Sequence, residues 1–180
     1  AENSQIVTDG QTATSLSVNG TLTRVTTETV SGRTGLNSFS VFNVFEGNQV
    51  DLILPENTDS LINMVHQQRT TIDGVLNAYK DGKIGGDVYF LNPFGVLVGQ
   101  QGVINAGSLK ISTPTPTFMQ QMFTGPQVIS APAVQQVLDN GMPISTTGLI
   151  EVRGQINAVD TVRMAAGTID VSGTVQSGEN

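Results

Sequence analysis

The chain has 180 residues, a mass of 18.9 kDa and a formal net charge of −7. Its eight Lys and Arg residues are scattered, which argues against a nucleic-acid or anionic-membrane partner, and the absence of cysteine excludes disulfides and thiolate chemistry. No apolar run approaches the length of a membrane span. One domain over residues 1–180 is expected, and its abundance of Thr, Ser, Asn, Gln and Gly is typical of β-structure with many turns.

The first segment, residues 1–30, alternates weakly between apolar residues and Thr or Ser. Because β-branched Thr is favoured in strands, two or three short strands are predicted, paired antiparallel as a cap over the end of the main body. The start "AENSQIV" lacks the basic and apolar regions of a signal peptide, and the chain stops in mid-pattern at "GTVQSGEN". We therefore expect these residues to be part of a longer protein.

The segment from residue 36 to residue 68 contains most of the aromatic mass outside the centre of the chain. The run "LNSFSVFNVF" is assigned to the core rather than to a ligand platform. Residues 50–54 alternate as a strand that Pro55 ends. For residues 56–68 two structures remain open, a capped helical turn and a strand.

The most regular stretch is "DVYFLNPFGVLVGQQGVINAGSLKIS", residues 87–112. Its apolar runs 88–91 and 96–98 are too short for helices and are predicted to be strands buried on at least one face. The residues between these runs are Asn92, Pro93, Phe94 and Gly95. Proline donates no ladder hydrogen bond and glycine tolerates positive φ, so these four residues predict a turn.

Residues 113–147 interrupt the strand pattern and hold five of the seven prolines. They predict an excursion from the main body, with a short helix near residues 133–138. Phe118, Met119, Met122 and Phe123 are expected to fold back on the body. If they are exposed instead, Phe118 and Phe123 are the candidate ligand contacts of this segment.

The final segment, residues 148–180, contains a repeat. The string "GLIEVRGQI" from Gly148 realigns with "GTIDVSGTV" from Gly167, 19 residues later. Three short strands in each repeat, with apolar residues inward and polar residues outward, predict one coil of a three-sided parallel β-helix. A β-sandwich is the alternative, but its turns usually come every 8 to 12 residues, which is wider than here.

Four strings in this order, "NSFSVFNV", "VDLILP", "TIDGVL" and "DVYFLNPFGVLVGQQGVINAGSLKIST", resemble the N-terminal secretion domain of two-partner secretion exoproteins such as filamentous haemagglutinin. The resemblance runs from about Gly10 to Thr113. It implies an all-β fold, a right-handed parallel β-helix with an N-terminal cap. It also implies that the domain heads a large adhesin, cytolysin or contact-dependent toxin.

The resemblance further implies a route and a partner. The exoprotein would cross the inner membrane of a Gram-negative bacterium into the periplasm. An outer-membrane TpsB transporter of the Omp85 type, a β-barrel with POTRA domains, would then recognise it and pass it to the cell surface or medium. No cofactor is implied, and a monomer is expected. The family turn is typically Asn-Pro-Asn-Gly, and here Phe94 replaces its second Asn. The chain has no other Asn-Pro, and this places it nearer the adhesin-like members than the haemolysin-like members.

The turn at Asn92–Gly95 therefore has two interpretations, a contact for the transporter and a purely structural turn. His66, the only histidine, lacks a nucleophile motif and is interpreted as a half-buried polar residue rather than a member of a triad or metal site. Some β-helices are polysaccharide lyases or hydrolases, but the sequence shows no catalytic site. The charged residues near predicted coils are expected on different faces: Glu151, Arg153, Asp160, Arg163 and Asp170.

Three functions are compatible with these interpretations. The first is a secretion and folding module recognised by a TpsB transporter. The second is direct adhesion of the β-helix to a host or matrix glycan or protein, through the excursion. The third is a polysaccharide-active enzyme, which requires two carboxylates that converge in a cleft.

Overall fold

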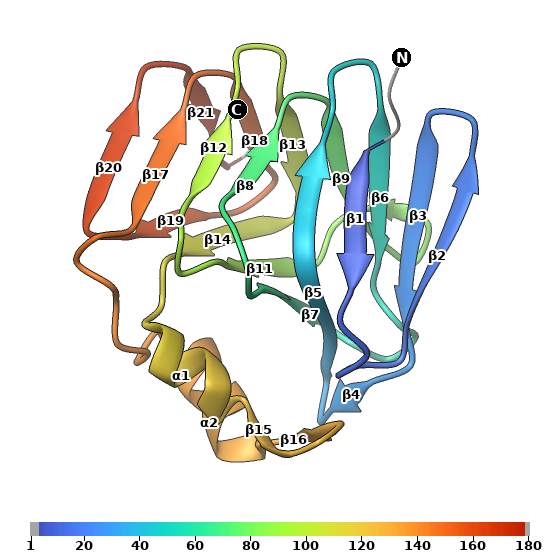
Figure 1. The fold of residues 1–180 in the computed structure, drawn as a ribbon. Helices are drawn as coiled ribbons and strands as arrows, with labels where there is room; N and C mark the ends of the chain where they lie inside the picture. The colour runs from blue at the N-terminus through green and yellow to red at the C-terminus, as the bar shows by residue number, and fades with distance from the viewer. Residues whose placement is uncertain (1–3, 179–180) are drawn as a thin grey trace.

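Short parallel strands coil into a three-sided β-helix in the computed structural model, which describes residues 4–178 (Figure 1). The first face consists of the first half of β5 (Thr34–Val44), β7 (Ser60–Val65), β11 (Asp87–Leu91), β14 (Ser108–Ser112) and β19 (Val162–Ala165). The second face consists of the second half of β5, β8 (Thr70–Ile72), β12 (Val96–Val98), β17 (Leu149–Val152) and β20 (Thr168–Val171). The third face consists of β3 (Leu22–Thr27), β6 (Gln49–Ile53), β9 (Val75–Lys80), β13 (Val103–Ala106), β18 (Gln155–Ala158) and β21 (Thr174–Gln176). The predicted parallel β-helix is therefore confirmed.

The register of the last two coils reproduces the sequence repeat. Ile150 on β17 pairs with Ile169 on β20, and Ile156 on β18 pairs with Val175 on β21. Both pairs are 19 residues apart, as the realigned strings predict. Each strand alternates, so a one-residue slip would turn its apolar side chains outward, and burial of one face fixes the register.

Apart from the excursion, four of the described strands lie outside the regular coils. β1 (Gln5–Thr8) pairs antiparallel with β5, and β2 (Thr14–Asn19) pairs antiparallel with β3. On its other side β3 runs parallel to β6, not antiparallel, and so continues the third face by one strand. β4 (Val30–Ser31) and β10 (Lys83–Ile84) are short hairpin strands against β5 and β9.

The segment left open between helix and strand, residues 56–68, contains strand β7, and all residues of β7 are buried. Leu61 and Val65 point into the β-helix, where Phe39 and Phe42 pack edge to face with centroids 5.0 Å apart. Alternate residues of β7 face the other way and belong to a second apolar cluster. A strand covered on both faces reads as a continuous apolar run, which explains why its alternation could not be recognised.

The excursion covers the outer side of the first face (Figure 1). It consists of α1 (Pro116–Gln121), the hairpin β15 (Phe123–Gly125) and β16 (Val128–Ile129), and α2 (Ala131–Leu138). Both helices begin with a side-chain cap and a proline in the first turn: Thr115 accepts from the Phe118 amide, and Ser130 accepts from the Ala133 amide. The described residues include no helix that is long and apolar enough to cross a membrane.

Outward amides form a ladder along the third face. The side-chain nitrogen of Asn77 donates to Asp51 at 3.2 Å, that of Asn105 donates to Asn77 at 2.8 Å, and that of Asn157 donates to Asn105 at 2.9 Å. Each side chain therefore bridges two successive coils in the register of the backbone. These hydrogen bonds add a polar contribution to register that is independent of the apolar core.

Glycines mark the corner between the second and third faces because the coils approach closely there. A Cβ at Gly154 would collide with the carbonyl oxygens of Gly99 and Gly102 in the preceding coil. A Cβ at Gly173 would likewise collide with the carbonyl oxygen of Gly154. The glycines at this corner are therefore explained by backbone contact between coils, as expected where two backbone segments pass closely.

Replacing Gly154 with alanine should lower the free energy of unfolding by about 1–3 kcal/mol, the usual range for overpacking, because backbone atoms have to move. The matched control is Gly85→Ala, where the added methyl group would make only ordinary contacts of 3.7 and 3.8 Å at a φ that is not positive. Urea unfolding of both variants checks the prediction. Equal stability of the two variants would contradict the proposed close approach of the coils.

Candidate functional site

The turn between β11 and β12 is held from within by Asn92. This side chain is fully buried; its nitrogen donates to the carbonyl of Gln68 at 2.8 Å and to Thr70 Oγ1 at 3.0 Å. Its oxygen accepts the Phe94 amide at 2.9 Å, and the Gly95 amide donates to the Asn92 carbonyl at 3.1 Å. Asn92 therefore closes its own turn and fastens it to the preceding coil.

Of the other three turn residues, two are fixed by the structure and one is exposed on the surface. Gly95 has a φ of +109°, and a Cβ there would collide with the carbonyl oxygen of Leu149 on the next coil. Pro93 is buried, whereas Phe94 is 50 % exposed. The structure of the turn is therefore sufficient to explain the presence of Asn92, Pro93 and Gly95. Phe94 is the turn residue that a partner can reach.

The two aromatic residues expected as ligand contacts have different environments. Phe118 is 1 % exposed and packs in the second apolar cluster, with Leu36 and Tyr89 of the first face among its members. Its side chain is therefore not available to a ligand. Phe123 is only partly buried and lies at the wall of a surface cavity.

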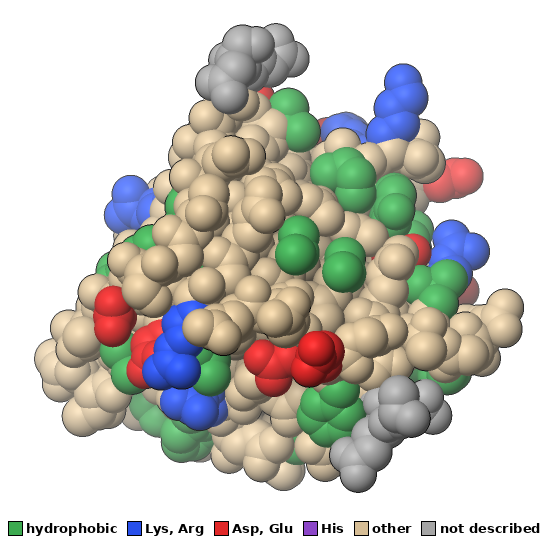
Figure 2. All heavy atoms as spheres, turned by 90° about the horizontal axis from the view of Figure 1, so that it is seen from above, with side chains coloured by type: hydrophobic (Ala, Val, Ile, Leu, Met, Phe, Trp, Pro, Cys, Tyr) green, Lys and Arg blue, Asp and Glu red, His purple; other side chains and the backbone are tan. Residues whose placement is uncertain are grey.

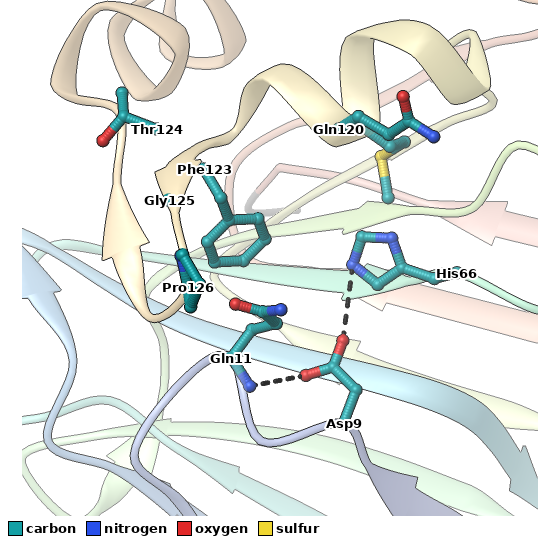
Figure 3. A pocket seen from close by; sticks show the side chains of 9 residues that line it. Asp9, Gln11, His66, Gln120, Phe123, Thr124, Gly125 and Pro126 are labelled. Atoms are coloured by element: carbon teal, nitrogen blue, oxygen red, sulfur yellow. Dashed lines mark hydrogen bonds and ion pairs between the residues drawn. The ribbon is translucent and has the colours of Figure 1, made fainter.

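This cavity has a volume of about 440 Å³ and lies between three segments distant in sequence (Figure 3). Asp9 and Gln11 come from the loop after β1, His66 follows β7, and Met119 and Phe123 come from the excursion. In the sequence, His66 is conspicuous as the only histidine, but no pattern indicates which residues lie beside it in the cavity. Other depressions on the described surface have similar volumes, so the residues that line this one, and not its size, distinguish it.

Below the cavity, Ser38 joins His66 and Asp9. Ser38 Oγ donates to Asp9 Oδ2 at 2.6 Å and lies 2.9 Å from His66 Nε2. A Ser-His-Asp triad requires the serine and the carboxylate on opposite ring nitrogens, but here both lie on the Nε2 side, with Asp9 Oδ2 3.7 Å from Nε2. Ser38 is also fully buried, so this arrangement is a structural hydrogen-bond network.

Burial lowers the pKa of His66 below its ordinary value, although the nearby Asp9 carboxylate acts in the opposite direction. The imidazole is therefore neutral at pH 7 in the folded state. His66 is partly buried, in agreement with its interpretation as a half-buried polar residue.

A pair of hydrogen bonds closes the cavity at the tip of the excursion. The Gln127 amide donates to Gln11 Oε1 at 3.0 Å, and its side-chain nitrogen donates to the Gly10 carbonyl at 3.2 Å. The β15–β16 hairpin is thus fastened to the loop after β1, across more than a hundred residues of sequence.

On the face seen in Figure 2, charged side chains form small groups among uncharged side chains and backbone. Arg33 and Lys80 both pair with Asp59, and the hydrogen bond from Arg33 is the main reason that the Asp59 pKa lies well below its usual range. The expectation that the charged residues of the last coils would separate is wrong for two pairs. Arg153 forms an ion pair with Glu151 at 2.8 Å. Glu151 and Asp170 stand in register on β17 and β20, because an outward residue one repeat later faces the same way.

Among residues 4–178, no group of three or more His, Asp or Glu side chains is arranged to hold a metal ion.

Replacing Asn92 with alanine should reduce the free energy of unfolding by about 1–3 kcal/mol, because Thr70 Oγ1 and the Phe94 amide lose a buried partner. Phe94→Asn removes an exposed ring from the same turn and should change stability by less than about 0.5 kcal/mol. Thermal or urea unfolding measures both. A larger loss for Phe94→Asn than for Asn92→Ala would contradict this division of roles.

The lowered pKa of His66 predicts a loss of stability in acid. Because the unfolded state binds the proton more readily, the contribution of neutral His66 to the free energy of unfolding is fully present above pH 6.5. This contribution is lost as the pH falls below 6.5. His66→Gln, which stays neutral, should lose less stability between about pH 7.5 and about pH 5.5 in urea unfolding. Taking the difference between the two proteins cancels the other titrating groups, and parallel pH profiles would refute the prediction.

Comparison with protein families matches residues 4–180 to the model of the TPS secretion domain. No curated protein matches the sequence. The family match extends the resemblance beyond the strings at residues 10–113 to the excursion and the last coils. The chain therefore belongs to the TPS secretion domain family and is a secretion module of a two-partner secretion exoprotein.

Proposed function

We propose that this domain is the export signal and folding nucleus of a large, adhesin-like exoprotein. In this proposal the exoprotein reaches the periplasm and is recognised there by the POTRA domains of a cognate TpsB transporter. The family match over residues 4–180 carries the proposal, because it covers the whole arrangement of strands, turn and excursion described above.

The surface that we assign to the transporter is the open edge of β2. Within residues 4–178, β2 pairs with β3 alone, so its outer backbone groups have no strand partner. Leu16 and Val18 on this strand are 36 % and 59 % exposed. An exposed edge with apolar side chains favours addition of a strand from a partner, in which backbone hydrogen bonds supply affinity.

The role as folding nucleus is supported by the way in which the coils bury their apolar residues. The interior cluster runs without a break from Phe39 in the first coil to Ile156 in the fourth. Inward residues of the last coil, Ile169 and Val175, are 44 % and 37 % exposed, whereas their counterparts Ile150 and Ile156 are fully buried. A further coil would bury them, so each completed coil is a template for the next.

The test is export of a reporter fused behind residues 1–180, in cells with and without the cognate transporter. We expect export only with the transporter, and a clear reduction for Val18→Lys, because a charged edge strand resists pairing. The control is Val128→Lys, a similarly exposed valine on the excursion, which should be exported normally. Export that is independent of the transporter would refute the proposal, and normal export of Val18→Lys would refute the assignment to β2.

A further inference from the structure

The cavity beneath the excursion plays no part in the proposed function, and it contains a carboxylate without a cationic partner. Asp9 Oδ1 accepts the Gln11 amide at 2.9 Å, and Oδ2 accepts Ser38 Oγ at 2.6 Å. No Lys or Arg within residues 4–178 forms an ion pair with Asp9. Each carboxylate oxygen has two acceptor sites, so acceptor capacity remains at this partly exposed group.

A second acceptor comes from the tautomer of His66. Ser38 has one hydroxyl proton and gives it to Asp9, so the hydroxyl oxygen must accept from His66 Nε2. The neutral ring then carries its proton on Nε2, and Nδ1 is a lone-pair acceptor. Figure 3 shows this second nitrogen on the side of the ring turned away from Asp9, toward Gln120.

An aromatic ring completes the arrangement. Phe123 lies beside Gln11 and His66 at the cavity wall, with its centroid 6.4 Å from that of the imidazole (Figure 3). The ring is only partly buried. An aromatic face attracts a cation within about 6 Å of its centroid, and the attraction grows when the site is partly desolvated.

We propose that this cavity binds a guanidinium group, as carried by an arginine side chain. The negative charge of Asp9 repels anions and favours a cation. A guanidinium is planar, donates five hydrogen bonds, accepts none and stacks on aromatic rings, which matches a cavity lined by the Asp9 carboxylate and the Phe123 ring. His66 Nδ1 is a further acceptor, on the side of the imidazole turned away from Asp9. An ammonium ion lacks the planar face, and a saccharide brings acceptor oxygens that the Asp9 carboxylate and His66 Nδ1 do not satisfy. The volume of about 440 Å³ leaves room for the chain that carries the guanidinium.

The test is an NMR titration of the 180-residue chain with N-acetylarginine amide, followed at the His66 ring and the Phe123 amide. The matched control ligand is N-acetylcitrulline amide, which has the same shape without the charge. We expect saturable shifts with arginine and at least about tenfold weaker binding of citrulline, because a charge-assisted hydrogen bond is lost. Methylguanidinium distinguishes two kinds of site. A site for the free cation should bind methylguanidinium as well as it binds N-acetylarginine amide, whereas a site for a peptide arginine should bind methylguanidinium more weakly.

Two variants locate the binding. Phe123→Leu and Asp9→Asn should each weaken arginine at least about fivefold, whereas Phe94→Leu, an exposed ring on another turn, should leave it unchanged. Should Asp9→Asn fail to fold, Phe123→Leu and the citrulline comparison still decide the question. Equal binding of citrulline, arginine shifts unaffected by Phe123→Leu, or binding of methyl glycosides in place of arginine would each overturn the proposal. None of these outcomes depends on export.

Discussion

Parallel stacking of coils at backbone contact distance is the constraint on which the rest of this structure depends. Each coil gains its hydrogen bonds and its apolar burial from the coils above and below, and none can be stable alone. The close approach also explains the composition of the corners. At Gly154 and Gly173 the facing atoms are carbonyl oxygens of the preceding turn, which cannot rotate away as a side chain can. The spacing of glycine is therefore a consequence of stacking and not only of turn formation.

The excursion solves a problem that stacking alone creates. The first face carries apolar residues on its outer side as well as its inner side, for example Ile62 and Leu91. Exposed to water, they would form a patch on a strand surface, which is a hazard for association. α1 and α2 bury this patch under Met119, Met122 and Val137. The excursion is thus a covering layer for part of the β-helix, and its aromatic Phe118 is used for packing.

The regular part of the fold could be predicted from the sequence because its signals are local. Alternation around Glu151 involves a few neighbouring residues, and the shift from Gly148 to Gly167 spans only 19 residues. The register of Ile150 with Ile169 is their consequence. Strand β7 was ambiguous because burial on both faces removes alternation. The roles of Asn92 and Gly95 were only half accessible: a turn was evident, but its bonds to Thr70 and its contact with Leu149 depend on which coils lie next to it.

The cavity was not predictable for the same physical reason. Its members come from residues 9–11, 66 and 119–126. Ser38 joins Asp9 to His66, and the packing of the excursion and the hydrogen bonds of Gln127 bring the third segment to them. If the proposed export starts at the N-terminus, this order of segments has a consequence for the cavity. β1 can pair with β5 as soon as residue 44 has emerged, but Asp9 and His66 stay open to solvent until the excursion has also emerged. Phe123 belongs to the excursion, so the guanidinium site proposed above is complete only when the excursion has packed against the first coils.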